Sequence, residues 1–439
     1  MQPIRPPVPL TFRPGLKPAR RPSPSYPAKM PLRRWPAQSL LLAVLAVFLA
    51  GRLEAVDLNL LGTNLPPLAF HGFLSQGFLA TTKYDYLAHN SRDGSFAFTE
   101  AGLNVAMDPF PRTHFAAQGF LFDVGDVGQY DPVLDYALVD YNFSDAFGIR
   151  AGRILRPEGI YNTSQSIDLA RTSVFLPQGM YDSRWRDFDG SLDGGSIYGN
   201  FPLSQAGDLS YEIYAGLLDI TDNGGVARQL QNELNNPPVS SFTGFKNNTP
   251  PVYGFQFWWD TPVAGLRAGT AGFMSGGLSY AYQVSPPYGP GAVTGFTDAG
   301  PNIQESLEYL WRNWTFQAEY QYVDYRISST FPGGPETTFY TVCNTWYVSA
   351  SYRVNAWLEA GSYYTEYYDN NPKSVTTAAS DASQNDLALS LRFDPKLWWV
   401  VKVEAHYIRG TGLLEDNADN PVRNGDGWFM LALKTTFSF

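Results

Sequence analysis

The sequence has little of what stabilises an ordinary soluble domain. Its single cysteine, Cys343, cannot form an intrachain disulfide, so a disulfide-stapled fold is excluded. Charged residues make up only 16% of the 439 residues, where about 25% is usual for soluble domains. Cys343 shares one side of its segment with Thr345 and Tyr347, and no basic residue adjoins it. We therefore interpret it as a small filler residue rather than a reactive thiol.

The sequence also lacks a hydrophobic run long enough for a membrane-spanning helix. The only long apolar run, Ser39–Gly51, has 13 residues, whereas a spanning helix needs about 20. It follows Arg33 and Arg34 and precedes the small residue Ala55, which is the order of regions in a secretory signal peptide. We expect residues 30–55 to be a signal peptide, cleaved after Ala55, and residues 56–439 to form the mature domain.

Residues 1–29 have no acidic residue but nine prolines and six basic residues, so they cannot build a core. They are either a basic, proline-rich arm or a segment that precedes the true start at Met30. The second reading is favoured, because a signal peptide normally begins at the N-terminus. Residues 1–55 hold nine basic residues and one acid, and without them the formal charge of −10 becomes −18. Such a surface makes nucleic acid an implausible partner.

Patterns for cofactors, metals and catalysis are absent too. The four histidines (His71, His89, His114 and His406) show no metal-ligand spacing. The acidic segment Glu415–Gly427 fails the calcium-loop pattern at Ala418 and is expected to be a solvated loop. No G-x-S-x-G nucleophile motif is present. We expect a protein that has no cofactor, no metal site and no enzymatic activity.

What the chain does contain is segments in which apolar and polar residues alternate. In Thr315–Tyr325, the residues Phe316, Ala318, Tyr320 and Tyr322 alternate with Gln317, Glu319 and Gln321. Leu397–Tyr407 and Asp386–Phe393 alternate in the same way, with Arg, Lys and Glu on the polar side. Successive side chains of a strand point to opposite faces, so each segment predicts a strand with one apolar and one charged face. Lipid outside and water inside a β-barrel require this pattern.

The connections between these segments alternate between short and long. Tight turns such as Arg312–Asn313 are followed by long polar loops such as Asp369–Gln384, and seven of the eleven tryptophans lie close to a short turn. Short turns on one rim and an interfacial tryptophan belt are typical of outer-membrane barrels. We predict an all-β fold, a transmembrane antiparallel barrel of about 16 strands. The predicted strands are residues 68–82, 95–107, 113–123, 133–142, 147–155, 192–200, 208–219, 252–260, 264–284, 301–311, 314–327, 339–352, 356–367, 385–394, 397–409 and 427–439.

The chain ends on a strand whose apolar face includes Phe437 and the terminal Phe439. A closed barrel pairs its last strand with its first, and lipid provides surroundings in which both rings are stable. The terminal aromatic residue resembles the C-terminal signature of bacterial outer-membrane proteins. That resemblance implies that Phe437 and Phe439 form an assembly signal, which the barrel-assembly machinery reads.

One long connection, Gly152–Ser191, contains too many apolar residues for a solvated loop, among them Val174, Phe175 and Leu176. It follows the fifth predicted strand, where general bacterial porins place the loop that folds into the barrel and narrows the pore. Its stretch GRILRPEGIYNTSQSIDLARTSVFLPQGMY, together with HGFLSQGF near the first strand, resembles proteobacterial outer-membrane porin-like proteins. The resemblance implies that this connection is a constriction loop folded into the lumen.

Charged residues in this connection are the candidate functional residues. Either they create a transverse field that sorts solutes by charge, or they form salt bridges that fix the loop. The candidate constriction residues are Arg153, Arg156, Glu158, Asp168, Arg171, Arg184, Arg186 and Asp187. The candidate residues of the lumen wall are Glu100, Arg392, Lys402, Glu404 and Lys434.

These observations favour a passive diffusion channel for small hydrophilic solutes and ions in the outer membrane of a Gram-negative cell. A selective channel for phosphate or another small anion is an alternative. Such channels resemble this one in class, but they use rows of Lys and Arg along the lumen, and the mature chain has just six lysines. A barrel with a structural role is a further possibility, and an enzyme barrel would need a Ser–His pair with an orienting group. The expected partners are outer-membrane lipid, lipopolysaccharide and the barrel-assembly machinery, with a homotrimer as the expected assembly.

Overall fold

The structure is a computed structural model that describes residues 68–439, apart from 126, 235–239, 286–290, 331–332, 371–381, 415–419, 421–422 and 424. Every described residue belongs to one compact unit, Leu53–Phe439. The predicted N-terminal extension and signal peptide lie outside the described residues.

The described residues form one antiparallel sheet of 17 strands. The strands are β1 (Ala69–Thr81), β2 (Phe98–Phe110), β3 (Thr113–Val124), β4 (Val133–Ser144), β5 (Phe147–Leu155), β6 (Ser191–Pro202), β7 (Asp208–Leu217), β8 (Ser240–Asn247), β9 (Pro251–Asp260), β10 (Leu266–Val284), β11 (Gly291–Trp311), β12 (Trp314–Thr330), β13 (Glu336–Arg353), β14 (Leu358–Asp369), β15 (Ser383–Lys396), β16 (Trp399–Gly410) and β17 (Trp428–Ser438).

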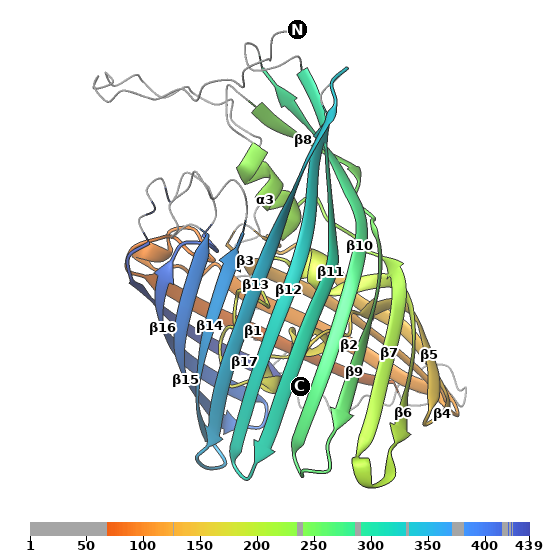
Figure 1. Cartoon of the computed structure of the whole chain (residues 1–439). Coiled ribbons are helices and arrows are strands. Elements are labelled where there is room, and N and C mark those ends of the chain that lie inside the picture. Colours follow the sequence, from red (N-terminus) through yellow and green to blue (C-terminus); the bar gives the residue numbers. More distant parts are fainter. Residues whose placement is uncertain are drawn as a thin grey trace. The chain divides into compact units, whose positions relative to one another are not determined.

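Sixteen of these strands close into a barrel (Figure 1). Neighbours in sequence pair with each other, except that β7 pairs directly with β9. The ring closes where β17 pairs with β1, from Phe73 opposite Ser438 to Thr81 opposite Met430. The remaining strand, β8, pairs with the end of β10 that extends past β9. The expected 16-stranded transmembrane architecture is therefore confirmed, with one additional short strand outside the ring.

Side-chain alternation defines the two faces of the wall. Along β16, Lys402, Glu404 and His406 are buried, whereas Tyr407 on the opposite face is 41% exposed. On β15, Leu389 is 59% exposed. An apolar face that is left exposed, opposite a charged face that is buried, is the reverse of a water-soluble protein. It is the arrangement of a wall that lies between lipid and a polar interior.

The predicted strand boundaries agree with the observed ones to within a few residues at most positions. The clearest differences lie in the predicted long loops. Residues 291–300, which lie outside the predicted strands, belong to β11, and β8 lies between the predicted strands 208–219 and 252–260. Figure 1 shows β10–β13 extending past their neighbours, with β8 beside β10. Inside the membrane, lipid requires apolar and polar side chains to alternate along a strand. The extension is not subject to that requirement, so its strands could not be predicted from alternation.

The helices within the part of the chain that the structure describes are few and short. They are the 3-10 helices η1 (Ser91–Asp93), η2 (Asn162–Ser164), η3 (Asp168–Ala170) and η4 (Ser204–Ala206), and the α-helices α2 (Arg186–Asp189) and α3 (Gly225–Leu234). Within the described residues, none of the helices is long and apolar enough to cross a membrane.

Candidate functional site: a loop fastened to the inner wall

Residues 156–190, here called the inner loop, connect β5 to β6 and contain η2, η3 and α2. The inner loop forms hydrogen bonds with side chains of β9, β12, β14, β15, β16 and β17. These side chains lie on the buried, polar face of the wall, opposite the exposed apolar face. The hydrogen bonds therefore place the inner loop on the lumen side of the ring.

Asp168, at the start of η3, makes the most connected attachment. Its Oδ1 accepts hydrogen bonds from Nζ of Lys402 at 3.0 Å and of Lys434 at 3.3 Å. Its Oδ2 accepts one from the Thr436 hydroxyl at 2.6 Å. Burial alone would raise the pKa of the Asp168 carboxyl, but Lys402, Lys434 and Arg171 hold it well below its usual range. The charged carboxylate thus joins the inner loop to β16 and β17.

Glu404 of β16 makes a second attachment through the loop backbone. Its two carboxylate oxygens accept hydrogen bonds from the backbone N–H groups of Val174 and Phe175, each at 2.9 Å. The Ser390 hydroxyl also donates to Glu404 at 2.5 Å, and Nε2 of His406 lies 3.0 Å from it. A buried carboxylate needs several such partners to remain stable. Here two of them come from the inner loop, which fixes the loop backbone at residues 174–175.

Glu319 of β12 makes a third attachment, on a different side of the ring. It accepts hydrogen bonds from the Ile160 backbone N–H at 2.9 Å and from the Tyr347 hydroxyl at 2.8 Å. The Tyr181 hydroxyl donates to the same carboxylate. Residues 160 and 181 of the inner loop are thereby held at one carboxylate, while residues 168–175 between them are held at β16 and β17.

Apolar packing completes these attachments. Val174 and Phe175 are fully buried, and the Phe175 ring stacks on that of Phe98 with centroids 4.8 Å apart. Leu176 packs with Tyr347 in a smaller buried cluster. Burial of apolar surface stabilises by about 25 cal/mol per Å². The packing explains why this connection is rich in apolar residues, since a solvated loop would leave them in water.

Most of the predicted constriction arginines are buried and paired. Arg156 lies 3.0 Å from Glu158 and 2.7 Å from Asp189, and its guanidinium sits over the Phe273 ring at 4.2 Å. Burial raises the pKa of Glu158 to about 7; Arg156 opposes this rise, and the nearby Asp189 adds to it. The buried carboxyl of Glu158 and the partly exposed carboxyl of Asp189 thus share one cation, at the point where the two ends of the inner loop meet.

The other charged residues of the inner loop are also held in local contacts. Arg171 lies 3.6 Å from Asp168. Arg184 pairs with Asp182, while Arg186 lies 3.8 Å from Asp135 of β4 and over the Phe120 ring at 4.3 Å. These contacts agree with the interpretation of the charges as salt bridges that fix the loop. The Asp187 carboxylate is buried beside the start of α3, and burial raises its pKa to about 7.

Arg153 is a correction, because it does not belong to the constriction. It is opposite Ala137 and Asp193 in the sheet, on the same face as the exposed Ile149 and Ile197. Its guanidinium lies 3.3 Å from Asp193 and 3.2 Å from Asp219, on the outward side of the wall. Strand alternation continues through Gly152, so Arg150 faces the lumen and Arg153 faces outward.

The predicted lumen-wall residues lie on the inner face. Lys434 donates to Glu100 at 2.6 Å, and Nη1 of Arg392 donates to the Leu169 carbonyl at 2.7 Å. Lys402 and Glu404 bond to the inner loop as described above. All five residues are buried. Arg392, Lys402, Glu404 and Lys434 therefore fasten the loop to the wall. Glu100 pairs with Lys434, so none of the five faces an open column of water.

A polar network on the inner face of β4–β7 was missed by the sequence analysis. Arg150 Nε lies 3.1 Å from Asp140, and Arg150 Nη1 lies 2.8 Å from Glu212. The Arg150 side chain is 26% exposed, so this network remains open to the lumen. The signal was present, because Arg150 alternates with Ile149 and Ala151, which face outward.

The two terminal aromatic residues occupy the seam of the barrel. Phe437 stacks on Trp399 with centroids 5.7 Å apart. Phe439 exchanges two backbone hydrogen bonds with Gly72, at 3.1 and 3.0 Å. Its ring covers the Gly72 backbone so closely that a Cβ at that position would lie 2.4 Å from the ring. Gly72 thus provides the space that the C-terminal ring fills.

No group of His, Cys, Asp and Glu side chains among the described residues is placed to hold a metal ion. No protein-family model matches the chain, and no curated protein is significantly similar to it. Similarity appears in solved structures. OmpF of Salmonella typhi, in complex with daunomycin, is 13% identical with a TM-score of 0.51, covering 85% of this chain and 98% of that one.

Two further structures have the same architecture. The outer membrane channel DcaP of Acinetobacter baumannii is 10% identical with a TM-score of 0.50, covering 85% of this chain and 97% of DcaP. A loop-deletion mutant of OmpT, an outer membrane protein of Vibrio cholerae, is 11% identical with a TM-score of 0.50, covering 86% of this chain and all of that one. The fold of this chain is therefore that of the sixteen-stranded bacterial outer-membrane porins.

Proposed function

We propose that the protein is an outer-membrane porin, a passive channel through which small hydrophilic solutes and ions diffuse. The observation that carries this proposal is a closed barrel with an apolar outer face and a charged loop fastened to its inner face. The inner loop reduces the free cross-section of the lumen, and the network around Arg150 lines the part that remains. Charges in such a confined space act strongly on passing ions.

Reconstitution of the purified protein in planar bilayers tests this function. Stepwise increases in conductance and a finite reversal potential in a salt gradient are expected. A membrane that contains correctly folded, heat-modifiable protein but shows no conductance steps would identify a structural barrel instead.

A phosphate-type channel and an enzyme barrel receive less support. Lys402 and Lys434 are committed to Asp168, so they do not form a free row of cations for a phosphate-type channel. An enzyme barrel would need a histidine that activates a serine hydroxyl. The nitrogens of the buried His406 instead face Asp386 and Glu404. We accordingly propose a channel that has no enzymatic activity.

We also propose that the barrels assemble as homotrimers in an outer membrane that contains lipopolysaccharide. Two small side chains lie opposite each other on the outer face, those of Ala117 and Ala137. Small residues permit two barrel walls to approach closely. Native mass spectrometry of the detergent-purified protein should find three copies per particle, and a strictly monomeric particle would contradict this assembly.

A further inference from the structure

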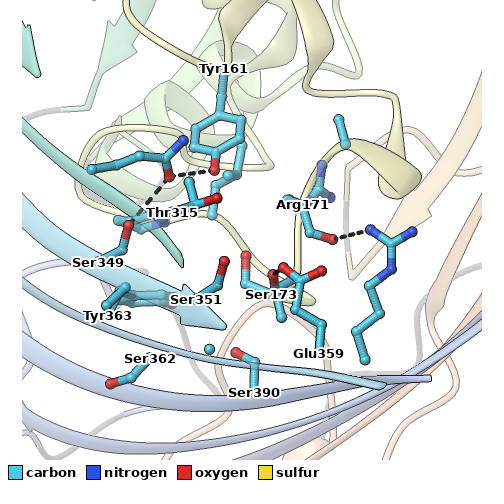
Figure 2. A pocket seen from close by; sticks show the side chains of 18 of the residues that line it. Tyr161, Arg171, Ser173, Thr315, Ser349, Ser351, Glu359, Ser362, Tyr363 and Ser390 are labelled. Carbon is cyan, nitrogen blue, oxygen red and sulfur yellow. Dashed lines mark hydrogen bonds between the residues drawn. The ribbon is translucent and has the colours of Figure 1, made fainter. Parts of the chain in front are cut away.

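A cavity of about 390 Å³ lies between the inner loop and the inner wall of β11–β15 (Figure 2). Its loop side includes Tyr161 and residues 169–173, and its wall side includes Thr315, Ser351 and Glu359. Leu310, Thr315 and Arg353 belong to the short-turn ends of their strands, so the cavity lies toward that rim. Its volume falls at the lower end of the roughly 300–1,000 Å³ usual for small-molecule sites.

The charged groups that line the cavity are already paired with groups of the protein. Arg171 lies 3.6 Å from Asp168. Arg353 pairs with Glu359 at 2.7 Å and also with Asp394. Arg392 pairs with Asp394 at 2.8 Å. A charged solute would have to break one of these pairs or enter without a counter-charge, and either route is unfavourable in a partly desolvated site.

Glu308 is neutralised in the same way, since it accepts from Arg267 and from the Gln317 amide. None of the carboxylates that line the described cavity is therefore left to balance a solute cation.

Several hydroxyl groups that line the cavity, in contrast, are available to bind a solute. Among the described residues, the side-chain hydroxyls of Ser173, Thr315 and Ser351 have no hydrogen-bond partner, and all three residues line the cavity. Each hydroxyl both donates and accepts, which matches the hydroxyl groups of a solute. The Tyr161 hydroxyl is fixed by Gln317 at 2.6 Å, so the position of its ring beside the cavity is fixed as well. An aromatic ring offers an apolar surface for the C–H face of a sugar ring.

We propose that this cavity is a binding site for a neutral, polyhydroxylated solute of the size of a mono- or disaccharide. The inference rests on the proposed channel function, because the cavity then lies on the diffusion path and binding there favours neutral sugars over charged solutes of equal size. The loop supplies Tyr161 and Ser173, and the wall supplies Thr315 and Ser351, so the site exists only while the inner loop is in place.

The test compares glucose and maltose with gluconate and glucosamine on reconstituted channels. Glucose or maltose should reduce the potassium chloride current saturably, whereas gluconate and glucosamine at equal concentration should not. Changing Thr315→Val and Ser351→Ala together removes two hydroxyl partners and should weaken sugar binding by about tenfold or more. Ser351→Thr keeps the hydroxyl at residue 351 and should retain most of the affinity.

The matched control is Ser362→Ala. Ser362 borders the cavity, but it is opposite Ala350 and Leu389 in the sheet, so its side chain belongs to the outward face with that of Leu389. The change should leave sugar binding unaltered. Saturation-transfer NMR of the detergent-purified protein measures the same binding without a current. Normal conductance combined with no sugar binding in either measurement overturns this inference but leaves the channel function intact. Sugar binding without conductance overturns the channel function alone.

Discussion

At the scale of single residues, Asp168 concentrates more interactions than any other group of the inner loop described above. Replacing it with asparagine leaves Lys402 and Lys434 buried without a counter-charge on the loop. Breaking a buried ion pair by removing one partner costs about 3–5 kcal/mol. We predict that Asp168→Asn releases residues 165–175 from the wall, which raises both the conductance and the rate of proteolytic cleavage within the loop.

The same change in a Lys402→Met background should be less severe, because one of the uncompensated ammonium groups is then absent. Asp193→Asn is the control, since Asp193 is in an ion pair on the outer face. Equal conductance and equal cleavage rates in Asp168→Asn and the parent protein would contradict the assigned role of Asp168.

A second prediction concerns pH. The folded-state pKa values of Glu158 and Asp187, both about 7, lie above their ordinary values of 4.5 and 3.8, and burial is the main cause. The protonated carboxyls therefore stabilise the folded loop, and this contribution is lost as the pH rises through about 7. Current fluctuations in single channels should increase between pH 5 and pH 8. Glu158→Gln combined with Asp187→Asn should make them independent of pH over that range, and a persistent pH dependence would point to other groups.

At the scale of elements, the inner loop carries the next prediction. Arg184 and Arg186 pair with Asp182 and Asp135, so removing both cations leaves two carboxylates uncompensated. The ion selectivity should then shift toward cations, measured as the reversal potential in a salt gradient. Deleting residues 169–176 should raise conductance, because this part fills lumen space beside β14–β16. If neither variant differed from the parent protein, the loop would not set the properties of the pore.

The elements differ in how far the sequence alone predicts them. Within the membrane, lipid requires every second side chain to be apolar, so strands such as β15 and β16 are readable from alternation. The side on which Arg153 lies was predicted wrongly, because arginines occur at both parities in this stretch, at 150, 153 and 156. Strand β8 and the start of β11 lie beyond the region where lipid imposes alternation. The cavity could not be predicted from the sequence either, because its hydroxyls come from strands and a loop that are far apart in sequence.

At the scale of the whole molecule, the seam between β1 and β17 yields the last prediction. Phe439 provides the final backbone pair with Gly72 and covers that glycine with its ring. Deleting Phe439 removes both contacts and the last outward aromatic residue of the strand. A loss of about 1–2 kcal/mol changes the abundance of a protein severalfold. We expect severalfold less heat-modifiable protein in the outer membrane, as measured by gel shift at native expression.

The channels that do form from the shortened chain should conduct normally. Phe439 belongs to the outward face of the strand, whereas Thr436, which contacts the inner loop, belongs to the inner face. Unchanged abundance would show that the terminal residue has no part in assembly. A variant that replaces Gly72 with leucine should reproduce the defect, since its side chain would occupy the place of the Phe439 ring.

The contacts of the inner loop with the wall also have a mechanical consequence. The three attachments join the loop to β12 through Glu319 and to β16 and β17 through Asp168 and Glu404. A further ion pair joins Arg186 of the loop to Asp135 of β4. A hollow cylinder deforms most easily by becoming oval, which brings two opposite walls together and moves the other two apart. A loop inside the cylinder that is bound to separate points of the circumference resists that motion. The inner loop thus stiffens the barrel against lateral pressure from the surrounding membrane.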